Sequence, residues 1–261
     1  MFCFQCEQTA KCTGCTGAVG VCGKKADTAE LQDRLTGALI GLARATDGNE
    51  HMLSASTADV VVEGLFATLT NVNFDNDALL ALMDRVAAEK RKLVPECYKC
   101  ASACGRNNDY DMRKLWNADE DIRSLKSLIL FGIRGVAAYA YHAAVLGYRD
   151  ETIHKFLYKA LFAIGMDDWR MEELLPIVLE VGEVNLRCME MLDRANTETF
   201  GHPEPTDVSL TVEKGPFIVI TGHDLHDLKR LLEQTEKMLI GLFKEMHLMH
   251  STTTVTLRKI F

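Results

Sequence analysis

The chain has 261 residues, which is enough to bury a sizeable core in one or two domains. Its 37 acidic residues outnumber its 29 Lys and Arg residues, giving a formal net charge of -8. Proteins that bind nucleic acid neutralise phosphates with clustered basic side chains, so this balance argues against DNA or RNA as a partner.

The N-terminus is crowded with thiols. Of the nine cysteines, Cys3, Cys6, Cys12, Cys15 and Cys22 lie in the opening segment MFCFQCEQTAKCTGCTGAVGVCG. A CxxC pair can hold one metal centre from a single turn, and two later thiolates return across a loop rich in Gly and Thr. Cys3, Cys6, Cys15 and Cys22 therefore predict a [4Fe-4S] cluster.

Two alternatives compete with the iron-sulfur interpretation. Cys12 and Cys15 form a second CxxC, so the spacing is also compatible with a structural zinc site of four cysteines. A disulfide framework is less favoured, because the first residues lack a basic start followed by an apolar stretch, the pattern of a secretory leader. We expect reduced thiols and a cytoplasmic protein.

The middle of the chain has helical periodicity. Apolar residues recur at spacings of three and four from Leu31 to Leu42, from Ile122 to Val136 and from Leu174 to Leu192, and the first of these helices is expected to begin near Asp27 or Thr28. Gly64, Gly132 and Gly135 each cost about 1 kcal/mol inside a helix, which predicts close helix contacts at these positions. We expect a mainly helical fold built as a bundle.

The helix around residues 120 to 146 carries three further predictions. Asp119, Glu120 and Asp121 are expected to decorate its first turn, where negative charge meets the positive end of the helix dipole. Its apolar stretch from 128 to 146 is nearly long enough to cross a bilayer, but it contains Arg134 and His142, so a buried bundle helix is favoured over a membrane span. Aromatic and His side chains near its end, Tyr139, Tyr141 and His142, are expected to pack against neighbours.

A second group of thiols lies in PECYKCASACGRNNDYDM. Cys97, Cys100 and Cys104 could supply three ligands, and Cys188 could supply a fourth. Simple reduced thiols or an adventitious metal site are the favoured interpretation, with a second cluster as the alternative.

The architecture is expected to change after the linker ANTETFGHPEPTD. The β-branched run PFIVIT followed by GHDLHDLKRLLEQTE predicts a strand, a turn and a helix, which is the start of an α/β domain. His223 lies in the turn, at the carboxyl end of the strand, where open α/β layers usually place their ligands. From the residues alone, a turn or capping histidine is the favoured interpretation.

Several segments together resemble the hybrid cluster proteins, also called prismanes or hydroxylamine reductases. They are MFCFQCEQTA, GCT, VCGK, TAELQDRLTGALIGLA, VEGLFATLTNVNFD, DEDIRSLKSLILFGIRGVAAYAYHAAVLGY, ANTETFG and GPFIVITGHDL, and the resemblance covers residues 1 to 236. It implies Cys3, Cys6, Cys15 and Cys22 as ligands of a four-iron cubane, with Cys12 as a spacer. It also implies His223 as a ligand of the hybrid iron-sulfur-oxygen cluster.

The resemblance further implies a domain layout. Residues 1–214 are expected to form two three-helix bundles, one from 1–60 and 150–214 and the other from 61–149. Residues 215–261 are expected to begin an α/β domain with a divergent tail. Family members continue for several hundred residues with further cluster ligands, whereas here no cysteine follows Cys188. We therefore expect a truncated product, from a frameshift or an early stop, in which no catalytic site is complete.

Two functions follow. By resemblance the chain is an oxidoreductase that reduces hydroxylamine to ammonia, or reduces nitric oxide. Its electrons would come from a donor protein, which its acidity suits, and would enter through the N-terminal cluster. The alternative is an electron-transfer or cluster-binding module without reductase activity. Neither a nucleic acid nor a membrane is expected as a partner.

Overall fold

The computed structural model describes residues 1–6, 14–46, 53–70, 72–93, 108–205, 207, 217–220, 224–235 and 241–244. The chain divides into two compact units, Met1–Arg194 and Ala195–Phe261. The predicted domain layout, with its two three-helix bundles, stays a prediction.

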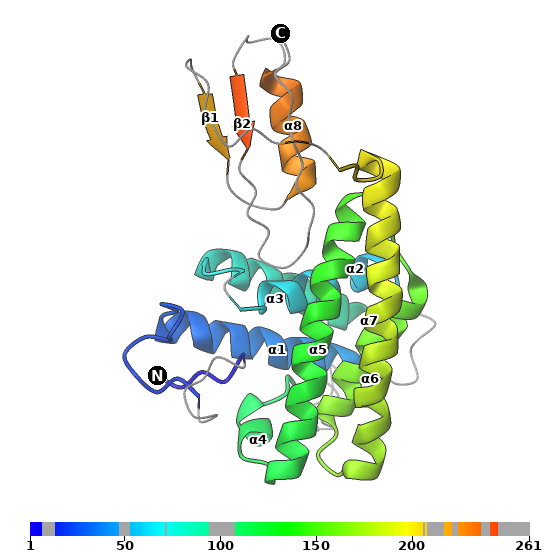
Figure 1. Ribbon diagram of the computed structural model, residues 1–261. Coiled ribbons are helices and arrows are strands. Elements are labelled where there is room, and N and C mark those ends of the chain that lie inside the picture. The colour runs from blue at the N-terminus through cyan, green and yellow to red at the C-terminus, as the bar shows by residue number, and fades with distance from the viewer. Residues whose placement is uncertain are drawn as a thin grey trace. The chain divides into compact units, whose positions relative to one another are not determined.

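Helices make up the first unit, which confirms the prediction of a mainly helical fold (Figure 1). They are α1 (Ala26–Thr46), α2 (Ala55–Ala67), α3 (Asn76–Leu93), α4 (Met112–Trp116), α5 (Glu120–Val145), α6 (Glu151–Gly165) and α7 (Met171–Phe200), the last of which ends in the second unit.

The apolar stripe of α1 forms the centre of the core. Leu35, Leu39 and Leu42 are fully buried, and α1 contacts α3 and α6, while α5 contacts α2 and α6.

Local sequence fixes several helix starts. Ser54 and Thr57 form a reciprocal capping box at α2, which satisfies two backbone N–H groups that the helix cannot pair. Asp119 precedes α5 as predicted, with two acidic residues in the first turn.

Two of the three glycines predicted at close helix contacts lie at such contacts. A Cβ atom on Gly132 would lie 2.5 Å from Val181 of α7, and one on Gly64 would lie 2.9 Å from Leu39 of α1. The prediction was wrong for Gly135, because, apart from the backbone of its own helix, no atom of the described residues lies within 4 Å of its Cβ position. The sequence did not predict a close contact at Gly37, which is tighter still: a Cβ atom on Gly37 would lie 2.2 Å from the carbonyl oxygen of Tyr110.

The helix α5 is long and apolar enough to cross a membrane by length and composition. Arg134 in its middle is nevertheless fully buried inside the protein. Near its end Tyr141 stacks on Phe66, with ring centroids 4.7 Å apart, and His142 lies edge-on to the same ring. These two side chains pack as predicted, whereas Tyr139 is 37% exposed because it falls on the outer side of the helix.

The second unit contains a strand, a helix and a second strand. They are β1 (Phe217–Ile220), α8 (Leu225–Thr235) and β2 (Gly241–Lys244). The strands pair in parallel, with Phe217 opposite Gly241 and Ile220 opposite Lys244. β1 and α8 were expected from the sequence, and β2 was not. Parallel strands joined through a helix form the βαβ unit on which α/β folds are built.

Candidate metal centre

The cysteine-rich N-terminus is folded by backbone pairing between two of its thiol-bearing residues. Cys3 and Cys15 exchange both backbone hydrogen bonds, at 3.0 and 2.8 Å, in a single antiparallel bridge. Gly14 enters this bridge with φ +87°, in the left-handed region that favours glycine. The bridge joins the CxxC turn to the later loop, although the two are separated along the chain.

A tight turn then brings the fourth thiol back. The N–H of Gly20 donates to the carbonyl oxygen of Lys24 at 2.8 Å, and the N–H of Gly23 donates to that of Gly20 at 2.9 Å. Gly23 has φ +83°, so the sequence GVCGK closes a loop with Cys22 at its tip. From the sequence, these glycines indicated only that the segment is a loop. In the structure, Gly20 and Gly23 form the turn itself.

All four predicted cluster ligands line one cavity. Cys3, Cys6, Cys15 and Cys22 surround it, together with Gln5, Gly20, Val21, Lys24 and Thr70. Cys3 is buried, Cys6 and Cys15 are half-buried, Cys22 is exposed, and all four are free thiols. The structure thus brings the four thiols together at the surface of the first unit.

The donor set can be tested against the two metal centres that the sequence left open. A mononuclear zinc site needs four donors within about 2.3 Å of one ion. No group of three or more His, Cys, Asp or Glu residues in the described part of the chain is arranged to hold a single ion. An iron-sulfur cube takes one thiolate per iron and so separates its four sulfurs around a larger core. The four thiols that line the cavity supply the four donors that either centre requires.

Gln5, between the first two cysteines, forms the centre of a buried polar cluster. Only 3% of Gln5 is exposed. Its amide nitrogen donates to the carbonyl oxygen of Ala29 at 2.9 Å and to Asp33 Oδ1 at 2.7 Å, and its amide oxygen accepts from Lys24 Nζ at 2.7 Å. Lys24, 4% exposed, also donates to Gln32 Oε1. A lysine in the wall of the cysteine cavity is thereby held in place by two amides.

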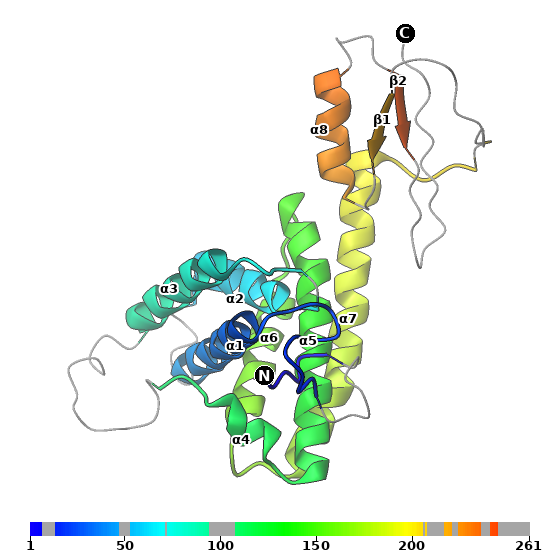
Figure 2. The ribbon, with the colours of Figure 1, turned by 90° about the vertical axis from the view of Figure 1, so that its left-hand side faces the viewer.

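Arg134 reaches the same segment from α5, and Figure 2 shows the N-terminal trace in front of this helix. Its guanidinium donates to the backbone carbonyl oxygen of Gln5 at 2.9 Å, and to the hydroxyls of Thr68 and Thr36, both at 3.1 Å. Complete burial lowers the pKa of Arg134 to about 10, and the negative charges of Asp33, Cys3 and Cys6 act in the opposite direction. At neutral pH the guanidinium therefore remains charged.

Burial and charge oppose each other at Cys3. Burial raises the pKa of the Cys3 thiol, because a thiolate is poorly solvated there. The positive charge of Lys24 and the backbone N–H of Gln5 lower that pKa. Lys24 and this N–H thus favour the thiolate, which is the form that binds metal, while burial, Asp33 and Cys15 keep the pKa of Cys3 above its ordinary value.

Aromatic packing fixes the CxxC turn to the helices. Phe4 lies between Cys3 and Cys6, and its ring lies 5.4 Å from that of Trp116 in α4 and 6.4 Å from that of Phe131 in α5. Aromatic pairs at such separations add about 0.5–1.5 kcal/mol beyond burial. The turn therefore has one apolar anchor and one polar anchor.

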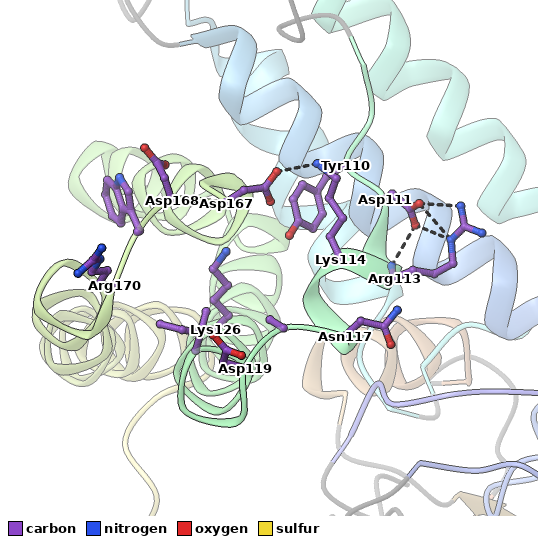
Figure 3. A pocket seen from close by; sticks show the side chains of 13 residues that line it. Tyr110, Asp111, Arg113, Lys114, Asn117, Asp119, Lys126, Asp167, Asp168 and Arg170 are labelled. Atoms are coloured by element: carbon purple, nitrogen blue, oxygen red, sulfur yellow. Dashed lines mark hydrogen bonds and ion pairs between the residues drawn. The ribbon is translucent and has the colours of Figure 1, made fainter.

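A second, open depression of about 750 Å³ lies beside α4 and the start of α5 (Figure 3). Its charged groups largely pair with one another. Lys114 bonds to Asp167 at 2.6 Å, and Arg113 bonds to Asp111 at 2.6 Å. Lys126 donates to the carbonyl oxygen of Met166 at 2.7 Å, and burial lowers its pKa. Among the described residues that line this depression there is no cysteine or histidine.

The remaining predicted site residues divide into two groups. Cys188 is fully buried in α7, and its thiol donates to the carbonyl oxygen of Val136 at 3.4 Å. Burial raises its pKa to about 12, so it is a core thiol rather than an accessible ligand. His223, Cys12, Cys97, Cys100 and Cys104 lie outside the described residues.

Comparison with known proteins decides the relationship. The model of the Prismane/CO dehydrogenase family matches residues 1–249. The chain belongs to this family. Three relatives named hydroxylamine reductase are similar to it: one from Solidesulfovibrio magneticus is 40% identical over 93% of this chain, one from Methanocella arvoryzae is 41% identical over 93%, and one from Thermodesulfovibrio yellowstonii is 43% identical over 90%.

The alignments cover nearly all of this chain but only about half of each relative. The aligned part makes up 48%, 49% and 47% of those three relatives. The chain thus spans about half the length of the curated relatives it matches. The match includes the cysteine cavity and its polar cluster, whose members Gln5, Lys24 and Arg134 were not recognised from the sequence. One signal was present, because Arg134 stood out as a charge within an apolar helix.

Proposed function

We propose that this chain is part of an iron-sulfur oxidoreductase of the hybrid cluster type, with a [4Fe-4S] cluster held by Cys3, Cys6, Cys15 and Cys22. The observation that supports it is the single cavity lined by all four thiols. When bound, such a cluster supplies one-electron transfer. The buried Lys24 and Arg134 favour the thiolates, and the exposed Cys22 lies where an electron-donor protein could approach.

The proposed reaction of the whole protein is the reduction of hydroxylamine to ammonia. Hydroxylamine takes up two electrons and two protons, its N–O bond breaks, and ammonia and water leave. Nitric oxide is proposed as the alternative substrate. His223, in the turn after β1, is proposed by family resemblance as a ligand of the second, hybrid cluster, and the protein is proposed to act in the cytoplasm.

A second candidate function is an electron-transfer or cluster-binding module without reductase activity. It is favoured by the fact that the four candidate ligands lie within the first 22 residues and all belong to the first unit. That unit could hold a cluster without contributions from the second unit.

Oxygen-free purification tests these proposals. We expect brown protein with four irons and four sulfides per chain and a paramagnetic signal after reduction. A Cys3→Ser, Cys6→Ser variant should lose the iron, while Cys188→Ser, which changes a buried core thiol, should keep it. Colourless protein with one zinc would contradict the cluster. Hydroxylamine turnover with a chemical reductant would support the reductase, and iron-loaded protein without turnover would support the module.

A further inference from the structure

Two buried cations lie beside the cysteine cavity. Lys24 lines the cavity itself, and Arg134 donates a hydrogen bond to the backbone carbonyl oxygen of Gln5, a residue that also lines it. Lys24 and Arg134 are 4% and 0% exposed. Burying a charge costs several kcal/mol unless it is compensated. Of the described side chains hydrogen-bonded to Gln5, only Asp33 is acidic.

The cations are fixed rather than mobile. Gln5 accepts from Lys24 through its amide oxygen and from Arg134 through its backbone oxygen, so one residue of the CxxC turn holds both. Thr68 and Thr36 complete the partners of the guanidinium. Charges fixed in a region of low dielectric act more strongly on a neighbouring charge than they would in water.

We infer that Lys24 and Arg134, positioned by Gln5, set the reduction potential of the N-terminal metal centre. The inference rests on the proposed [4Fe-4S] cluster. One electron arriving from a protein donor adds one negative charge among the four thiolates, and no bond breaks. Two fixed positive charges stabilise that added charge, so they raise the potential. Asp33 acts in the opposite direction and lowers it.

A potentiometric titration of oxygen-free protein, monitored by electron paramagnetic resonance, tests this inference. The variants are compared with the parent at equal iron content per chain. Lys24→Gln should lower the equilibrium constant for reduction at least tenfold, about 59 mV for a one-electron couple. Lys24→Arg, which keeps the charge, should stay near the parent. Lys25→Gln is the matched control, because Lys25 is the adjacent lysine and is exposed. Asp33→Asn should shift the potential upward.

The potentials of Lys24→Gln and Asp33→Asn should shift in opposite directions if charge is the cause. Loosening of the loop would shift both potentials in the same direction. Should Lys24→Gln fail to bind iron, Asp33→Asn still tests the sign. The inference is overturned if Lys24→Gln and Lys25→Gln share the parent potential, or if Asp33→Asn shifts downward. In that case the iron content of the parent still supports the proposed cluster. An iron-free parent would instead overturn the cluster and the inference together.

Discussion

The guanidinium of Arg134 donates a 2.9 Å hydrogen bond to the backbone carbonyl oxygen of Gln5, a residue 129 positions earlier in the chain. The bond joins the middle of α5 to the turn between Cys3 and Cys6. A buried charge in a long helix thus organises a backbone segment that has no regular secondary structure. The same contact links the helical core to the candidate metal centre.

Arg134→Met is expected to destabilise the metal-free protein by about 3 kcal/mol or more. The change removes the charged donor of three hydrogen bonds, each worth about 1.5–3 kcal/mol. The Gln5 carbonyl oxygen loses this donor, whereas Thr68 and Thr36 still donate to the carbonyl oxygens of Leu65 and Gln32. Urea unfolding followed by circular dichroism measures the effect. Arg34→Met, at an exposed position of α1, should change the stability by less than about 0.5 kcal/mol. Equal stability of the two variants would contradict the structural role of Arg134.

Two glycine substitutions should have opposite signs. Gly37→Ala places a methyl group 2.2 Å from the carbonyl oxygen of Tyr110, whose N–H donates to the Gly37 carbonyl oxygen, so we expect a loss of about 1–3 kcal/mol. In Gly135→Ala the new methyl group meets no atom of the described residues beyond its own helix backbone within 4 Å, so the change should add up to about 1 kcal/mol. Thermal unfolding of both variants provides the test, and a loss of stability in Gly135→Ala would refute the open space seen there.

Periodicity predicted the helices well, because their apolar faces form the core. It also assigned some exposed residues to the apolar faces: Leu128 and Leu175 belong to the predicted stripes but are 57% and 48% exposed. A spacing of three or four places a residue near a face without fixing how wide that face is. The strand β1 and helix α8 were also predictable from their β-branched and amphipathic patterns.

The polar cluster was not predictable in the same way. Gln5 lies in the CxxC turn and Lys24 lies at the end of a glycine-containing loop, and in neither segment does periodicity indicate which side chains are buried. Gln5 is bonded to Arg134, which is distant in sequence and which the sequence marks only as an expensive charge. The cysteine quartet could be proposed from spacing because metal ligands follow chemical rules. The residues that support it follow tertiary packing.

Phe4→Ala should weaken the CxxC turn. The ring packs on Trp116 and Phe131, and removing it leaves a gap between the turn and the helices. We expect a loss of about 2 kcal/mol, below the 3–5 kcal/mol of a fully buried Phe because Phe4 is only half-buried. Iron loss to a chelator should be faster than in the parent. Phe74→Ala, at a ring with 47% exposure, is the control and should match the parent in both measurements.

The buried thiol of Cys188 predicts a pH dependence at the alkaline end. Burial raises its pKa from 9.0 to about 12, so between these values the folded protein keeps a proton that the unfolded chain has released. The unfolded state then binds fewer protons, and stability falls as pH rises, by up to about 1.4 kcal/mol per pH unit for this one group.

Cys188→Ala removes this contribution while leaving the alkaline titration of buried tyrosines in place. The parent should therefore lose more stability than the variant between about pH 9 and 11, and the two should change in parallel below about pH 8. Urea unfolding of metal-free protein at a series of pH values gives the comparison. Native alkylation adds a second measure, because only the thiolate reacts, and Cys188 should be modified far more slowly than the exposed Cys22. Parallel stability curves up to pH 11 would show that the Cys188 thiol is not buried as the structure places it.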